Sequence, residues 1–96
     1  MSPKNKKKLN LLRVRLDKLD TNLLNIIKTR SNLVNEVLKL KEFKNEIVDK
    51  KRINFILKKI YTKSKKLKID PKITKRIWKN MIWSFIDYEK RNFKKK

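Results

Sequence analysis

Three charged residues in this sequence stand where the spacing of apolar residues predicts the inner face of a helix. From residue 9 the apolar residues recur every three or four positions, which is typical of one face of an amphipathic helix: Leu9, Leu12, Leu16, Leu19, Leu23 and Ile26. The same spacing, continued, places Arg30 and Lys41 on that face, and a later apolar stripe leads to Glu89. Because a buried charge without a counter-charge costs several kcal/mol, these three residues are candidates for a site that binds a charged ligand.

Two further arginines lie close to the predicted inner faces. Arg13 borders the first stripe, and Arg52 falls in the first turn of a second predicted helix. With Arg30 and Lys41 they outnumber the acids within reach, of which Asp49 and Glu89 are the most obvious. Any one of these cations alone is explained by an ion pair, or by a charge that reaches water past an apolar surface. As a set, they predict an anion site between helices, balanced by a ligand with two negative charges.

The residue types absent from the chain exclude several kinds of chemistry. There is no Gly, Cys or His among the 96 residues. Without Gly, phosphate-binding loops and dinucleotide motifs are difficult to form, because they need a close backbone approach. Without His or Cys there is no zinc site of the ordinary type and no Ser-His or Cys-His nucleophile. We therefore expect no metal and no cofactor, and chemistry that comes from charged groups, hydroxyl groups and shape.

The chain is strongly basic, with 30 Lys and Arg against 9 Asp and Glu and a formal net charge of +21. Such a balance suggests a polyanionic partner, so a basic helical nucleic-acid-binding protein is a competing hypothesis. However, Lys, Asn and Ile are abundant and Ala is absent, a bias that AT-rich coding produces on solvent-exposed faces. Five aromatic residues are candidates for base stacking, although their spacing mostly matches a core face: Trp78, Trp83, Phe85, Tyr88 and Phe93. We do not expect nucleic acid to be the main partner.

The first predicted helix is longer than a domain of this size. It extends over about residues 9–41, which corresponds to roughly 50 Å at 1.5 Å per residue. A compact globule of this chain length has a diameter of roughly 32 Å, so a second chain is needed to cover the apolar face. We expect an all-α fold in which three helices, one of them very long, form an intertwined homodimer.

The second and third predicted helices begin at capping residues. Residues 42–48 break the periodicity and predict a loop, after which Asp49 is a good N-cap. Asp70 and Pro71 are the expected N-cap and first residue of the third helix. The inner face of the second helix is predicted to carry Ile53, Ile56, Leu57, Ile60 and Tyr61. The third helix is predicted to bury Ile73, Ile77, Trp78, Met81, Ile82, Phe85 and Ile86.

We expect one domain over residues 9–93, with disordered basic tails at residues 1–8 and 94–96. The N-terminus lacks an apolar stretch long enough for a signal peptide, and no run reaches the length of a membrane-spanning helix. A cytoplasmic protein without a membrane partner is therefore expected.

The ordered set of these residues resembles the all-helical chorismate mutases. The similarity runs from about Leu9 to Glu89, and no single stretch of it is specific by itself. It rests on residues 11–20 with Arg13 and Asp20, on Leu23-Leu24 followed by Arg30, on residues 37–41 ending in Lys41, on residues 47–52 with Asp49 and Arg52, and on Ile77-Trp78 and Glu89. The resemblance implies a fold of helices only, a homodimer, and a di-anionic substrate.

In that family chorismate rearranges to prephenate in a pericyclic step without a covalent intermediate or a metal. The resemblance implies that Arg30 and Arg13 of the partner subunit bind the two carboxylates of the substrate through charge-assisted bonds. Lys41 and Glu89 would flank the ether oxygen, where negative charge develops as the bond breaks. Arg30, Lys41 and Glu89 are thus the expected catalytic residues. Because Arg30 and Lys41 lie in a crowded positive pocket, we expect that removing either lowers turnover without lowering stability.

The remaining implied substrate-binding residues are Asp49 and Arg52, which would shape the loop side of the pocket and hold the ring end, and Phe85. The sequence departs from the family pattern at two positions. Ile53 occupies a position where many mutases carry Glu, and Phe85 one where many carry Ser, with Ser84 displaced by one. The isochorismate-pyruvate lyases, a sister branch that forms salicylate, carry an aliphatic and an aromatic residue there. We predict a chorismate mutase of aromatic amino acid biosynthesis, with the lyase as the alternative.

Overall fold

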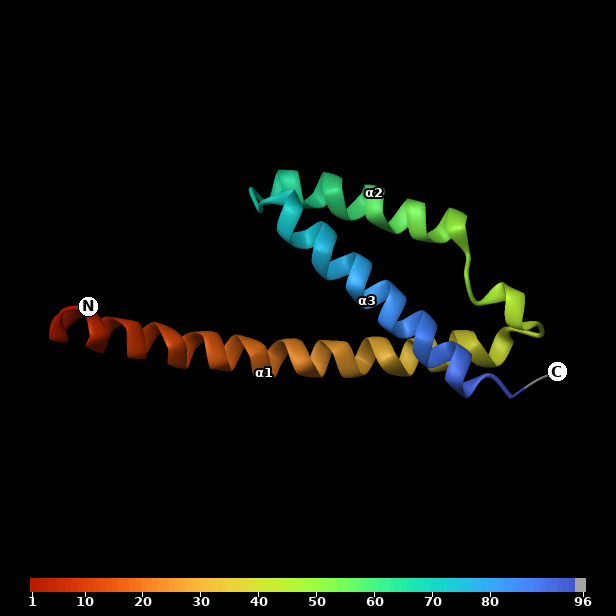
Figure 1. The fold of residues 1–96 in the computed structure, drawn as a ribbon, viewed down its shortest axis with the longest axis horizontal. Coiled ribbons are helices and arrows are strands. Elements are labelled where there is room, and N and C mark those ends of the chain that lie inside the picture. The colour runs from red at the N-terminus through yellow and green to blue at the C-terminus, as the bar shows by residue number, and fades with distance from the viewer. Residues whose placement is uncertain (95–96) are drawn as a thin grey trace. The chain divides into compact units, whose positions relative to one another are not determined.

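The computed structural model describes residues 1–94, and this part of the chain is all-α. It contains three α-helices and one short 3-10 helix, and no strand occurs among the described residues (Figure 1). The chain divides into two compact units, Met1–Leu33 and Val34–Lys96. The first unit is one helical segment, and the second contains the end of that helix with the other elements. The predicted fold class, three helices with one very long N-terminal helix, is confirmed.

Helix α1, Pro3–Leu40, is 38 residues long and begins earlier than the apolar pattern indicates. The Oγ atom of Ser2 accepts a hydrogen bond from the backbone N–H of Asn5 at 3.2 Å, and Pro3 stands at the first helical position, where its missing N–H is not needed. Residues 4–8, expected to form a disordered tail, are therefore part of the helix. Of the other predicted tail, Lys94 is described, and residues 95–96 lie outside the described residues.

The apolar stripe of α1 is exposed in the first unit. Leu19 and Ile26 are 61% and 64% exposed, and Leu12, Leu16 and Leu23 are more than half exposed. A single helix has no second surface of its own against which such a stripe can be buried.

The loop and the start of helix α2, Lys50–Lys66, agree with the prediction. Residues after α1 form an irregular segment with the 3-10 helix η1, Lys44–Glu46, inside it. Asp49 is the N-cap of α2, and its side chain accepts a hydrogen bond from the backbone N–H of Arg52 at 3.0 Å. Helix α3, Pro71–Asn92, begins in the same way, since the Asp70 side chain accepts from the backbone N–H of Lys72 at 2.9 Å.

The turn between α2 and α3 is closed by two backbone hydrogen bonds of a Schellman motif. The N–H of Ile69 donates to the carbonyl of Ser64 at 2.9 Å, and that of Lys68 donates to the carbonyl of Lys65 at 3.1 Å. Lys68 has a φ of 58°, a left-handed conformation that glycine usually occupies. The two helices form a hairpin that is closest at this turn (Figure 1), where the Ser64 and Thr74 hydroxyls form a buried hydrogen bond of 2.7 Å between them.

The core of the second unit is small. Its buried apolar residues are Leu38, Ile47, Ile82 and Ile86, against which Val48, Ile53, Ile56, Leu57 and Phe93 pack. The predicted inner faces are thus confirmed in their central parts but not at their ends: Tyr61, Ile73 and Ile77 are 52–55% exposed. The periodicity identifies a helix face correctly, but these residues lie where the second unit supplies no covering element.

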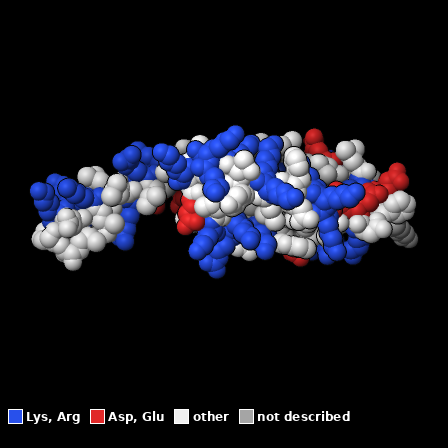
Figure 2. All heavy atoms as spheres, turned by 90° about the horizontal axis from the view of Figure 1, so that it is seen from above, with Lys and Arg blue, Asp and Glu red and all other residues white. Residues whose placement is uncertain are grey.

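The surface is dominated by positive charge. On the face shown in Figure 2, Lys and Arg side chains cover much of the surface, with few Asp and Glu between them. Among the described residues, no helix is long and apolar enough to cross a membrane.

Candidate active site

Lys41 and Glu89, two of the predicted catalytic residues, form an ion pair in the second unit. The Nζ atom of Lys41 donates to Oε1 of Glu89 at 3.0 Å. Their side chains are only 18% and 7% exposed, so water screens this pair much less than a surface ion pair. The structure therefore brings together two residues 48 positions apart that the sequence selected as charges on apolar stripes.

The ends of two helices position this pair. Lys41 follows the last residue of α1, and its backbone N–H donates to the carbonyl of Leu38 at 3.2 Å, which orients the chain as it leaves the helix. Glu89 lies one turn after the buried Ile86 on the inner face of α3 and is itself 5% exposed. Leu38 and Ile86 belong to the same core cluster, so apolar packing holds the two charged groups in reach of one another.

A second polar contact joins the same two helices and was missed from the sequence. The hydroxyl of Tyr88 donates to Oδ1 of Asn35 at 2.9 Å. In the sequence Tyr88 stands out only as an aromatic residue, and nothing distinguishes Asn35. No local signal marks such a contact, because it depends on how α3 is aligned against the end of α1.

Asp49 and Arg52 are held together through the N-cap of α2. The Asp49 carboxylate accepts from the backbone N–H of Arg52, while the Arg52 guanidinium lies 5.4 Å from the centre of the Phe55 ring. Both residues are exposed. Asp49 therefore has a clear structural role at the helix start, and Phe55 is the neighbour of Arg52 that a spacing of three positions on one helix indicates.

The other predicted site residues lie on two elements. Phe85 is half-buried on α3, one turn before Glu89. Arg13 and Arg30 both belong to α1 in the first unit. In the structure, Lys41 and Glu89 are in direct contact. Asp49 is bound to the backbone of Arg52 at the start of α2. Arg13 and Arg30, the two arginines expected to bind the substrate carboxylates, belong to the other unit.

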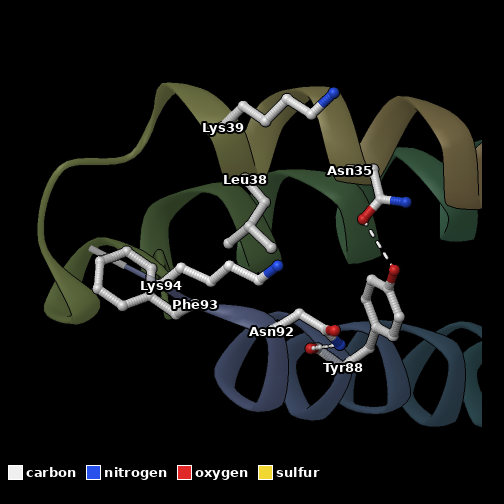
Figure 3. Close-up of a pocket in the computed structure, with 7 residues that line it drawn as sticks. All are labelled: Asn35, Leu38, Lys39, Tyr88, Asn92, Phe93 and Lys94. Atoms are coloured by element: carbon white, nitrogen blue, oxygen red, sulfur yellow. Dashed lines mark hydrogen bonds between the residues drawn. The ribbon is translucent and has the colours of Figure 1, made fainter.

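A cavity of about 350 Å³ lies beside α3 and the end of α1. Its lining combines apolar, amide and cationic side chains: Asn35, Leu38, Lys39, Tyr88, Asn92, Phe93 and Lys94. In Figure 3 the Tyr88 hydroxyl points toward Asn35, and the Lys94 side chain extends below Leu38. None of the predicted site residues lines this cavity. In residues 1–94, no three His, Cys, Asp or Glu side chains come together as a group that could hold a metal ion.

The helical fold and the buried Lys41–Glu89 pair define a class: an all-α protein with a charged site between the ends of two helices. Comparison with protein-family models matches residues 12–90 to chorismate mutase type II. Searches of curated proteins and of solved structures gave no match. Because the family match extends over most of the sequence, the chain belongs to the type II chorismate mutase family.

The ion pair changes the stability expected for one variant. The sequence alone predicts that Lys41→Ala preserves or raises stability. Because the Glu89 carboxylate is almost fully buried, we expect Lys41→Ala to lower the free energy of unfolding at neutral pH by about 3–5 kcal/mol, the cost of leaving a buried charge without its partner. Glu89→Gln should cost less, since the amide oxygen still accepts from Lys41. Urea unfolding followed by circular dichroism measures both, with Lys44→Ala, an exposed lysine of the same loop, as the control. Equal stability of Lys41→Ala and the wild type would contradict the pair.

Proposed function

We propose that the protein is a chorismate mutase that converts chorismate to prephenate in aromatic amino acid biosynthesis in the cytoplasm. The observation that carries this proposal is the buried Lys41–Glu89 pair, in a chain that belongs to the type II chorismate mutase family. Both residues occupy the positions that the family resemblance assigns to the groups beside the reacting ether oxygen.

The proposed mechanism needs only fixed shape and fixed charge. The rearrangement breaks a carbon–oxygen bond and forms a carbon–carbon bond in one step, so no nucleophile is required. Negative charge develops on the ether oxygen in the transition state, and the Lys41 ammonium is a donor that stabilises it. Holding the flexible substrate in its reactive conformation supplies the other part of the rate enhancement.

Glu89 contributes in this mechanism only as a hydrogen-bond donor. In the free protein its carboxylate accepts from Lys41. Beside the ether oxygen an ionised carboxylate would repel the developing charge, whereas a protonated one donates to it. The two negative charges of the bound substrate favour proton uptake by a neighbouring carboxylate. We therefore propose that Glu89 is protonated in the reactive complex.

The two substrate carboxylates are proposed to be bound by Arg30 of one chain and Arg13 of another. These arginines stand seventeen positions apart on the same helix, a separation of about 25 Å along its axis. This is too far for both to hold one small molecule from the same chain. Two α1 helices from different chains, with their exposed apolar stripes packed together, would meet this requirement in a homodimer.

Asp49, Arg52 and Phe85 are proposed to complete the pocket. Asp49 fixes the start of α2 and thereby the position of Arg52, which is proposed to hold the ring end of the substrate. Phe85 lies one turn before Glu89 on α3 and would contribute an apolar wall.

The second candidate function is that of an isochorismate-pyruvate lyase, which two residues favour. Ile53 and Phe85 stand where many mutases carry Glu and Ser, and neither side chain forms the polar contact to the substrate that those residues provide. The carboxylate clamp and Lys41 would serve both reactions.

Product analysis decides between these functions. The purified protein is incubated separately with chorismate and with isochorismate, and the products are identified by chromatography. We expect prephenate from chorismate and at most a trace of salicylate from isochorismate. Salicylate and pyruvate as the main products would instead assign the lyase reaction, and no turnover of either compound would refute both.

Arg30→Ala and Lys41→Ala should each lower turnover of chorismate by about 10²-fold or more, the scale of losing one preorganised electrostatic contact. The measurement is kcat and KM by loss of chorismate absorbance. Arg15→Ala and Lys44→Ala, which remove exposed cations from α1 and the loop, are the matched controls and should keep wild-type rates. A variant with wild-type activity but an early unfolding transition would show that its residue is structural.

Glu89→Gln should keep activity and change its pH dependence. Wild-type activity should fall as pH rises, because the Glu89 carboxyl group in the complex loses the proton that it donates. Glutamine donates at every pH, so the variant should lack this decline. Turnover of both proteins is measured from acidic to mildly alkaline pH. Superimposable profiles, or a variant that is inactive throughout, would exclude this role for Glu89.

The protein should be a homodimer whose main interface is the apolar stripe of α1. Leu19→Lys and Ile26→Lys should unfold the protein, because each would put a charge into the shared core. Thr21→Lys adds the same charge on the opposite face of the helix and should be tolerated. Light scattering at micromolar concentration should give twice the chain mass of 11.8 kDa; the mass of a single chain would disprove the dimer.

A further inference from the structure

Phe55 is an aromatic residue on the outer surface of α2 whose helical neighbours are all cations. Residues three and four positions away lie next to a helical residue on the helix surface, and here these are Lys51, Arg52, Lys58 and Lys59. We call these four residues together with Phe55 the Phe55 patch. The ring is 54% exposed, and the Arg52 guanidinium and Lys59 ammonium lie 5.4 and 5.7 Å from its centre.

The charge of α2 is not explained by the stability of the helix. Its 17 residues include eight Lys or Arg and no Asp or Glu. Three of the cations, Lys50, Lys51 and Arg52, occupy the first turn, where the helix dipole favours negative charge and disfavours positive charge. The Asp49 carboxylate at the N-cap offsets one of these three charges, and a negatively charged partner would offset the others, so the distribution fits a surface that binds an anion.

We propose that the Phe55 patch binds single-stranded nucleic acid, a function other than the proposed catalysis, with which the patch shares only Arg52. Surfaces that bind single strands combine cations along the phosphate backbone with exposed aromatic rings on which bases stack. Lys51, Lys58 and Lys59 supply charges on both sides of the ring, and Phe55 supplies the stacking surface. The Arg52 guanidinium, already over the ring, is a second planar group on which a base can stack.

An anionic membrane fits this surface less well. Helices that lie in a membrane interface insert a broad apolar face, but the apolar face of α2 packs into the protein core through Ile53, Ile56 and Leu57. Phe55 is then the one large apolar side chain in the patch. Double-stranded nucleic acid is also disfavoured, because its bases are stacked inside the helix and do not reach the ring.

The test measures binding of the full-length protein to a fluorescently labelled oligouridylate by fluorescence anisotropy. Wild-type affinity should fall steeply as salt rises, because phosphate contacts release counterions. Phe55→Leu keeps an apolar side chain but removes the ring, and it should weaken binding about tenfold. Lys58→Gln combined with Lys59→Gln should weaken binding at least as much and reduce the dependence on salt.

Two controls separate the patch from the general charge of the protein. Phe43→Leu removes a ring that is 57% exposed but follows Glu42 in the loop. Lys72→Gln combined with Lys79→Gln lowers the net charge by the same amount on α3. Both should change affinity less than twofold, and circular dichroism should show wild-type helix content in every variant.

Several results would overturn the proposal. They are no binding at low salt, equal binding by Phe55→Leu and the wild type, or equal losses in the two double-lysine variants. A duplex bound as tightly as the single strand would also overturn it. So would phosphatidylserine vesicles whose binding, unlike that of the oligonucleotide, depends on Phe55.

Discussion

The bond between Lys41 and Glu89 is the interaction on which the charged site of the second unit depends. It connects the residue that follows α1 to the inner face of α3, and apolar side chains surround the carboxylate. The chain has 9 acidic and 30 basic residues, and a carboxylate in its core is tolerated only beside a counter-charge. In the proposed function, the groups that neutralise each other in the free protein are those that the di-anionic substrate meets. Substrate binding would then exchange one set of charge contacts for another.

The exposed stripe of α1 imposes a second constraint. Its leucines and isoleucines are exposed, and a formal net charge of +21 makes association of two such chains electrostatically unfavourable. In the proposed homodimer, apolar burial must exceed this repulsion. Anions bound between the chains would reduce it, so the occupancy of the site and the strength of the dimer would be linked.

The sequence predicted the helices well because their signals are local. Asp49, Asp70 and Pro71 cap the helices where expected, and the central positions of the apolar stripes of α2 and α3 are buried or partly buried. The early start of α1 is not predicted by the apolar pattern, because residues 4–8 are charged or polar; its signal is Ser2, which caps the helix.

The candidate site was predictable only in part. The sequence identifies Lys41 and Glu89 as candidates because each is a charge on an apolar stripe, and in the structure their side chains form an ion pair. The Tyr88–Asn35 bond depends on the alignment of α3 against the end of α1, for which the sequence carries no local signal. The contact between Arg52 and Phe55 is different, because the two residues are three positions apart on one helix and such pairs are neighbours on a helix surface. Periodicity also does not say what covers a face, so the exposure of Ile73 and Ile77 was not foreseen.

The left-handed turn at Lys68 has a consequence for how this unit folds. A residue with a Cβ atom adopts this conformation at a cost of about 1 kcal/mol or more, and the chain has no glycine to avoid it. The turn is therefore not a preferred local structure that nucleates the α2–α3 hairpin. It is maintained by the contacts on both sides of it, including the buried Ser64–Thr74 bond. The hairpin should consequently form together with the core in one cooperative step, and its two helices should not persist as a pair once that core is lost.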